Sequence, residues 1–356
     1  MHSQDKPFFI IFAAELSGSY MGKFKLGGVA LAMISSASFG FIPLFSKPLL
    51  ASGVRLESVC LYRFILGSFF LGCFLFVRSL LDANKKATSQ IIIESSEKAF
   101  KPKETFGHKC TEPSLWKVAD ECFAISWKEL WHVLIVSIFY GGTAIFLTAS
   151  YNYLESGLGT TIHFLYPVFI ALIMAVGFKE KLNWRMTIAI GMAILGVACL
   201  SGAIRGGYSL NTTGFILVMI ATICYPIYIV SVNLSSTLMA IKGGKLSFYV
   251  LLCASLWFLI NVIAHGNGFS AIRGWDQWFN IIMLALVPTL IANFTLIYAI
   301  KSVGSTVTSI LGCMEPLTAV LVGIFYFREQ ISAFQYLGIA IILVAVMVVL
   351  HASSKK

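Results

Sequence analysis

Long apolar runs separated by short polar segments fill most of this chain. Hydrophobic residues make up 58% of the 356 residues and charged residues only 12%, whereas a soluble domain carries about 25% charged residues. Within lipid every backbone polar group needs an internal partner, so runs of this length are expected to be transmembrane α-helices. The sequence predicts an all-α membrane protein with ten spans, at Gly27–Leu50, Leu56–Val77, Leu130–Leu154, Leu158–Phe178, Asn183–Ser201, Thr213–Leu234, Phe248–His265, Trp278–Ile300, Ser305–Phe327 and Phe334–His351.

The positions of Lys and Arg predict how these spans are oriented. If the N-terminus is cytoplasmic, the outer loops hold only Arg55, Arg205, Arg273 and Arg328. Most other basic residues then lie in inner segments, which is the side that basic loops favour. Both termini are therefore predicted to be cytoplasmic. The basic residues lie between apolar runs and form no basic stripe, so nucleic acid is not an expected partner.

The second half of the chain repeats part of the first. A shift of 149 positions lays Gly159–Gly202 over Thr308–His351. Five spans per copy is an odd number, so the second copy should cross the membrane upside down, an architecture that recurs in secondary transporters. We predict an N-terminal extension at 1–21, a first five-helix repeat at 22–202 and a second at 203–356. The shift pairs Pro167 with Pro316, Tyr166 with Glu315, Phe178 with Phe327 and Glu180 with Glu329.

Residues 78–128 form the one large polar insertion. Lys and Glu are mixed along it, so we expect a charged cytoplasmic loop with some helix. A solvated linker is the favoured interpretation. A regulatory or partner-binding element is the alternative, and the protein would then act as a membrane receptor or scaffold through this loop.

Several motifs carry a resemblance to a known family. These are Tyr62-Arg63-Phe64 in the second span, Glu315-Pro316 in the ninth, and the paired span ends Phe178-Lys179-Glu180 and Phe327-Arg328-Glu329. In these motifs and in its two repeats, the chain resembles the EamA-type branch of the drug/metabolite transporter superfamily. The resemblance implies a ten-helix carrier of the bacterial inner membrane, often an exporter of amino acids or other small metabolites. It also implies a central cavity built from the first four helices of each repeat.

Glu315 is the leading candidate for a functional residue. It lies about ten residues, or about 15 Å, into the ninth span, close to the bilayer midplane. A charge there costs roughly 2.5–3.5 kcal/mol, so the carboxylate must be paired, hydrated or protonated. We predict that it couples transport to protons or anchors a cationic group of the substrate. The alternatives are a structural ion pair with Arg63 or Lys47, or a protonated side chain bonded to a neighbouring helix.

Six further side chains are candidates for substrate binding or coupling. Arg63 could bind a substrate carboxylate or form an interhelical pair, whereas Lys47 fits an interface anchor better. His163 is expected either to relay protons or to be bonded between helices. Glu329 is expected to meet the positive end of the tenth span. The complete set of candidates is Glu315, Arg63, Tyr166, His163, Asn293, Tyr225 and Lys47.

The sequence favours a secondary transporter that works by alternating access, with export as the direction that the family resemblance implies. It holds no HExxH, GxSxG or P-loop motif, so an enzyme and an ATP-driven pump are not expected. We also expect no cofactor and no metal site. The expected partners are a small-molecule substrate and the lipid bilayer, and protons are the candidate coupling ion. A homodimer is compatible with the sequence.

Overall fold

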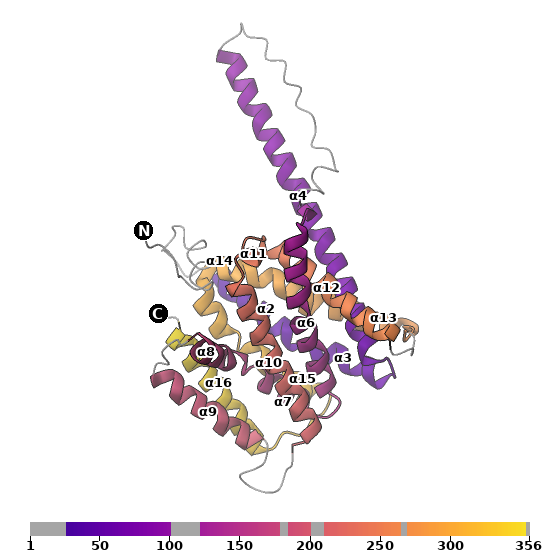
Figure 1. Cartoon of the computed structure of the whole chain (residues 1–356), viewed down its shortest axis with the longest axis vertical. Helices are drawn as coiled ribbons and strands as arrows, with labels where there is room; N and C mark the ends of the chain where they lie inside the picture. Colours follow the sequence, from indigo (N-terminus) through magenta and orange to yellow (C-terminus); the bar gives the residue numbers. More distant parts are fainter. Residues whose placement is uncertain (1–25, 101–121, 179–183, 201–209, 265–268, 354–356) are drawn as a thin grey trace.

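The computed structural model of the chain describes residues 26–100, 122–178, 184–200, 210–264 and 269–353 (Figure 1). These residues are entirely helical or in turns, with no β-strand among them. The N-terminal extension 1–21, Glu180 and the predicted boundary between the repeats at residues 202–203 lie outside the described residues.

The helices follow the apolar runs of the sequence. In chain order they are α2 (Leu26–Gly40), α3 (Ile42–Ala51), α4 (Leu56–Phe100), α6 (Trp127–Ser150), α7 (Ser156–His163), α8 (Tyr166–Gly177), α9 (Trp184–Leu200), α10 (Thr212–Leu234), α11 (Ser236–Met239), α12 (Gly243–Ala264), α13 (Gly274–Ala285), the π-helix η1 (Leu286–Ile291), α14 (Ala292–Leu311), α15 (Met314–Phe325) and α16 (Ala333–Ser353).

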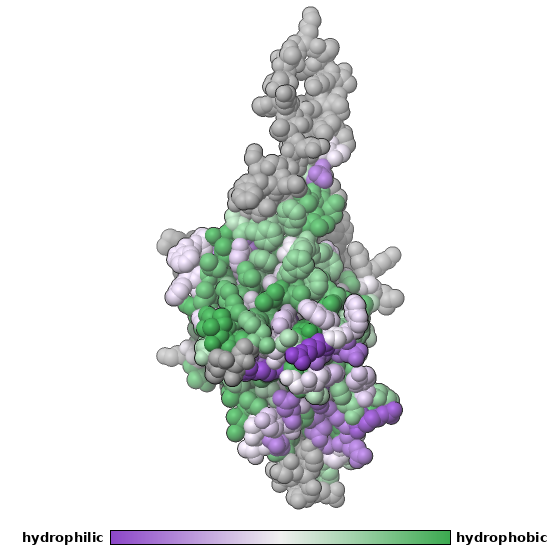
Figure 2. Space-filling model, turned by 90° about the vertical axis from the view of Figure 1, so that its right-hand side faces the viewer, coloured by the Kyte–Doolittle hydropathy of each residue, from purple (hydrophilic) through white to green (hydrophobic). Residues whose placement is uncertain are grey.

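The described helices have the lengths and the surface of membrane spans. Seven helical segments are apolar and long enough to cross a bilayer, and three shorter apolar helices lie at Thr187–Cys199, Met314–Phe325 and Ala333–Val348. Figure 2 shows apolar residues covering the middle of one face, with hydrophilic residues gathered below them. Large apolar side chains such as Val176, Ile194 and Phe325 are exposed, as expected where lipid replaces water. The all-helical membrane class predicted from the sequence is confirmed.

Four predicted spans contain a break or an irregular turn. The first is divided at Phe41 and the fourth at Phe164 and Leu165. The eighth contains the π-helix η1, and α14 gives way to α15 at Gly312 and Cys313. A proline lies within the first three residues after each break, or within the π-helix itself. Its ring prevents a regular helical hydrogen bond, which explains why the helix is interrupted there. These prolines are Pro43, Pro167, Pro288 and Pro316.

Two predicted boundaries need correction. Residues 301–304, predicted to connect the eighth and ninth spans, are helical and belong to α14, and they contain no proline that would end the helix. The hydropathy pattern predicts an end of the second span at Val77, yet α4 continues to Phe100 and projects from the bundle in Figure 1. At about 1.5 Å per residue α4 is about 68 Å long, more than twice the hydrocarbon thickness. The first part of the insertion is therefore helical.

Contacts between the two halves of the chain hold the bundle together. α2 packs on α14, α4 on α12, α6 on α10, α7 on α15 and α9 on α16. Small polar residues connect neighbouring helices, as is common in membrane bundles. For example, Ser35 donates a hydrogen bond to the Ala292 carbonyl (2.8 Å), and the Trp257 indole donates to Ser137 Oγ (3.0 Å).

Candidate functional site

A continuous row of aromatic rings runs through the interior of the bundle. Its members are Tyr166, Tyr225, Tyr228, Tyr140 and Phe64, from α8, α10, α6 and α4, and we call it the aromatic row. Successive ring centroids lie 4.9, 6.2, 5.1 and 5.7 Å apart. The four tyrosines keep some accessible surface although protein surrounds them deeply. None of the four is therefore completely enclosed by its neighbours.

Glu315 lies at one end of the aromatic row. It is in the first turn of α15, directly after the break at Gly312 and Cys313. Its carboxylate is close enough to the phenols of Tyr166 and Tyr225 to interact with them electrostatically. The described residues show ion pairs only for Lys47–Glu329 and Arg78–Asp82. Glu315 therefore forms no ion pair with Arg63 or Lys47 within the described part of the chain.

The position of Glu315 depends on a close approach between α2 and α15. A Cβ atom on Gly40, the last residue of α2, would lie 2.5 Å from the Glu315 carbonyl oxygen and 2.6 Å from Thr318 Cβ. These neighbours are backbone and the first side-chain carbon, which have little freedom to move. Only glycine therefore allows α2 to hold the first turn of α15 in this place.

We predict that Gly40→Ala will destabilise the bundle. Overpacking against backbone should lower the free energy of unfolding by about 1–3 kcal/mol. The matched control is Gly191→Ala in α9, where an added Cβ meets nothing within 4 Å and should cost nothing. Thermal unfolding in detergent measures both. Equal melting temperatures for the two variants would contradict the close approach at Gly40.

His163 is at the end of α7, beside the same group of rings. Its imidazole centroid lies 6.0 Å from that of Tyr166 and 5.7 Å from that of Tyr225. The side chain is only 5% exposed, and its Nδ1 has no hydrogen-bond partner among the described residues. A buried ring nitrogen without a partner is costly. The sequence left open the alternative that His163 forms a hydrogen bond to a neighbouring helix. The described residues show no such hydrogen bond from its imidazole.

Arg63 lies at the other end of the aromatic row. It is 7% exposed, its guanidinium carbon is 5.5 Å above the Phe64 ring, and its Nε reaches Thr289 Oγ1 at 3.4 Å. Thr289 belongs to the π-helix η1, and its carbonyl accepts a hydrogen bond from the Asn293 amide. Asn293 thus finds the partner expected for a buried amide. Together these residues stabilise the irregular turn that Pro288 creates.

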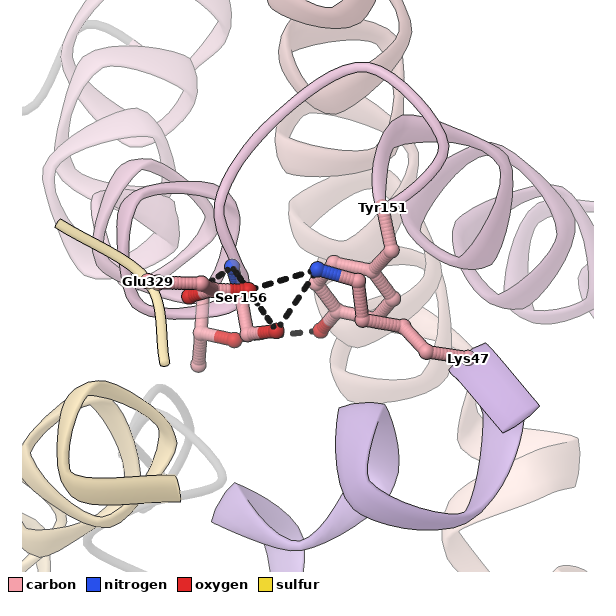
Figure 3. Close-up of polar contacts among 5 residues, drawn as sticks. Lys47, Tyr151, Ser156 and Glu329 are labelled. Carbon is pink, nitrogen blue, oxygen red and sulfur yellow. Dashed lines mark hydrogen bonds and ion pairs between the residues drawn. The ribbon is translucent and has the colours of Figure 1, made fainter. Parts of the chain in front are cut away.

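Lys47 forms a separate polar cluster with Glu329 and Ser156 (Figure 3). Its Nζ is 2.6 Å from Glu329 Oε1 and donates to Ser156 Oγ at 3.1 Å. The Glu329 carboxylate also accepts from the Ser156 backbone N–H (2.9 and 3.1 Å) and from Ser156 Oγ (2.9 Å). The prediction that Glu329 meets the tenth span is wrong, because it meets the first turn of α7. Gly323 leaves room for this carboxylate, since a Cβ there would collide with Oε2.

Tyr151 connects these three groups, and the sequence does not single it out as a site residue. It is 3% exposed, and its phenol forms a hydrogen bond with Thr160 Oγ1 (3.0 Å). It interacts electrostatically with Glu315, Arg63 and Glu329. A second shift, of 147 positions, pairs it with Tyr298. That pairing is the available signal, but Tyr298 is exposed and gives no hint of the role of its partner.

The comparisons with known proteins agree with this arrangement. The sequence matches the EamA-like transporter family over residues 115–202 and 212–351. It is 25% identical over 210 residues to the uncharacterized inner membrane transporter YedA of Escherichia coli K12, covering 58% of this chain and 66% of YedA. It is 31% identical over 107 residues to an uncharacterized transporter of Archaeoglobus fulgidus, covering 29% of this chain and 37% of that protein. Both matches span less than two thirds of the relative.

A solved crystal structure of another protein has the same fold. It superposes with a TM-score of 0.54, at 13% sequence identity, over 92% of this chain and 98% of that one. The family match covers more than half of the residues, in two separate segments of the chain. The chain is therefore a multi-pass inner-membrane protein that belongs to the EamA-like transporter family.

Proposed function

We propose that the protein is a secondary transporter that moves a small molecule by alternating access between two inverted five-helix repeats. The pattern of helix contacts supports this. If the repeats exchange spans five positions apart, α4 and α9 exchange with α12 and α16, and both of these pairs are in contact. The fourth span, α7 with α8, exchanges with the ninth, the end of α14 with α15, and these two spans are in contact through α7 and α15. The contact of α2 with α14 then corresponds to that of α10 with α6, which is also made.

The breaks in the helices support the same repeat. The shift of 149 positions brings the turn at Phe164 and Leu165 to within one residue of the turn at Gly312 and Cys313. Tyr166 and Glu315, which the shift pairs, both lie in the first turn of the helix after the break. Transporters commonly bind substrate where helices are broken near the bilayer midplane, at the interface between repeats.

The candidate site assigns different tasks to its residues. Glu315 is proposed to carry the coupling proton or to bind a cationic group, and Arg63 to bind an anionic group. Tyr166, Tyr225 and His163 are proposed to contact the substrate between them, and Asn293 to hold the irregular turn behind Arg63. Amino acids or other small metabolites fit two opposite charges separated by aromatic rings, and export is the proposed direction.

Lys47 and Glu329 are proposed to close the outer side of this site. The loop between α15 and α16 carries Glu329, while Lys47 and Ser156 belong to the first repeat. On the proposed topology all three lie near the outer face. Their contacts join the two proposed repeats there, which supports a conformation that is closed to the outside. Opening would require the ion pair and the contacts with Ser156 to separate.

The observation that carries the proposal is an interior carboxylate with no cationic partner among the described residues, beside partly accessible phenols. The test is uptake of radiolabelled amino acids into inverted vesicles that contain the full-length protein, with and without a pH gradient. Saturable uptake above empty vesicles is the expected result. Absence of uptake for every compound, with correctly folded protein, would contradict it.

A receptor or scaffold that acts through the insertion is the less favoured alternative. Residues 122–126 must be kept in testing it, because Tyr249 donates to the Phe123 carbonyl and Lys245 to the Ala124 carbonyl. We predict that replacing residues 86–120 by a flexible Gly–Ser linker of roughly ten residues will leave transport within about twofold of wild type. Loss of transport in a stable, inserted protein would favour the alternative.

A further inference from the structure

We infer that Glu315 and the tyrosine rings beside it form a binding site for an organic ammonium ion with an apolar body. This rests on the proposed transport function and narrows the substrate class. The site recognises the cationic nitrogen of the ligand. A carboxylate on the ligand adds little to the binding affinity at this end of the aromatic row. Amines are therefore ligands, alongside or in place of zwitterionic amino acids.

The charges and rings at the site favour a cation. Lys47 is engaged by Glu329, and the guanidinium of Arg63 lies on Phe64 at the far end of the aromatic row. The Glu315 carboxylate thus interacts with phenols and has no ion pair within the described part of the chain. The faces of aromatic rings are electron-rich and attract ammonium groups. A carboxylate beside such faces attracts cations and repels anions.

The arrangement of the rings also suits an ammonium group. Tyr166 and Tyr225 meet edge to face at 88°, with centroids 4.9 Å apart, so their faces point in different directions around a corner. Tyr228 extends the surface with a nearly parallel ring 6.2 Å from Tyr225. A cationic group in this corner would contact the ring faces of both tyrosines, and these contacts would offset part of the hydration that the group loses.

A second and independent observation indicates a ligand. The imidazole of His163 lies against Tyr166 and Tyr225, and its buried Nδ1 has no partner among the described residues. Buried polar atoms are normally satisfied by protein, water or a ligand. A neutral imidazole nitrogen accepts an N–H hydrogen bond. A primary or secondary ammonium group held against Tyr166 and Tyr225 can donate a hydrogen bond to this nitrogen.

Three probes that share a phenyl ring on a two-carbon chain test the inference on the purified full-length protein. They are 2-phenylethylamine, phenylalanine and 3-phenylpropionate, which present a cation, a zwitterion and an anion. Binding is measured in detergent by thermal shift and isothermal titration. We expect the amine to bind at least as tightly as phenylalanine, and any binding of the anion, which Arg63 is proposed to hold, to be unchanged in Glu315→Gln. Binding of phenylalanine but not of the amine, or weaker binding of the anion in Glu315→Gln, would overturn the inference.

Variants connect the binding to the named residues. Glu315→Gln should weaken the amine about tenfold or more. Tyr225→Leu should weaken it about three- to thirtyfold, whereas Tyr225→Phe, which keeps the ring face, should stay within about threefold. Equal affinity in Tyr225→Leu and Tyr225→Phe would overturn the inference even if one variant is less stable. Amine binding without transport would contradict the proposed function alone, whereas transport without amine binding would contradict this inference alone.

Discussion

Glu315→Gln is expected to abolish gradient-driven transport while leaving the protein inserted and folded. Glutamine keeps the size of the side chain but carries neither a negative charge nor an exchangeable carboxyl proton. An interior contact to a charged group is worth roughly 1.5–3 kcal/mol, which corresponds to about 10–150-fold in affinity. Because no ion pair of the described bundle includes Glu315, removing its charge should not leave a basic side chain unpaired. The loss should therefore appear in transport and not in stability.

Two transport assays separate the two roles proposed for Glu315. If the residue carries the coupling proton, Glu315→Gln should lose net uptake driven by a pH gradient but keep exchange of labelled for unlabelled substrate. If it binds a cationic group of the substrate, both activities should fall together. Asp276→Asn is the matched control, because it removes an exposed carboxylate in the first turn of α13. Undiminished net uptake in Glu315→Gln at normal expression would remove Glu315 from the site.

The sequence predicts the part of the site that the repeat contains. The shift of 149 positions pairs Tyr166 with Glu315 by spacing alone, and both lie just after a helix break. Helical spacing predicts the position of Tyr228. It is three residues after Tyr225, and residues three apart lie on the same face of a helix. The breaks themselves follow from Pro167 and Pro316, which prevent a regular helix at these points.

The contacts between repeats cannot be predicted in the same way. Spacing along the chain assigns Glu329 to the nearest helix, but the loop that carries it places the carboxylate on α7. Tyr140 reaches the aromatic row only because α6 packs on α10. Hydropathy and repeat spacing describe each half alone, whereas these contacts depend on how the two halves dock. For the same reason, the sequence around Lys47 indicates an interface anchor and gives no sign of its partner in the other repeat.

The contacts of Lys47 and Glu329 predict unequal effects when each charge is removed. Glu329 receives hydrogen bonds from the backbone and side chain of Ser156 as well as the ion pair. Lys47 contributes the ion pair, one hydrogen bond to Ser156 Oγ and a contact of its Nζ with the face of the Phe327 ring, 5.0 Å from the ring centroid. The two side chains are 21% and 9% exposed. Removing one partner of a fully buried ion pair costs about 3–5 kcal/mol, and removing one partner of a surface pair costs less than about 1 kcal/mol. For this partly exposed pair we expect an intermediate cost of about 1–3 kcal/mol.

Glu329→Gln should therefore open the outer side more than Lys47→Met does. It loses the ion pair and also the negative charge at the N-terminus of α7, where such a cap is worth about 1 kcal/mol. Each 1.4 kcal/mol shifts the balance between closed and open states about tenfold. Hydrogen exchange of the α7 backbone measures this directly, because the Ser156 N–H is held by the carboxylate. Faster exchange is expected in the order Glu329→Gln, Lys47→Met, wild type.

The exchanged pair Lys47→Glu with Glu329→Lys gives the decisive comparison. It restores opposite charges across the repeats but places a cation at the positive end of α7, so it should recover only part of the closed state and of the transport rate. The control is Arg328→Gln, which removes an exposed charge next to Glu329 and should match wild type. If both single variants and the exchanged pair also match wild type, Lys47 is the interface anchor that the sequence favours. Full recovery by the exchanged pair would instead show that the charge pair alone closes the outer side, without the contacts to α7.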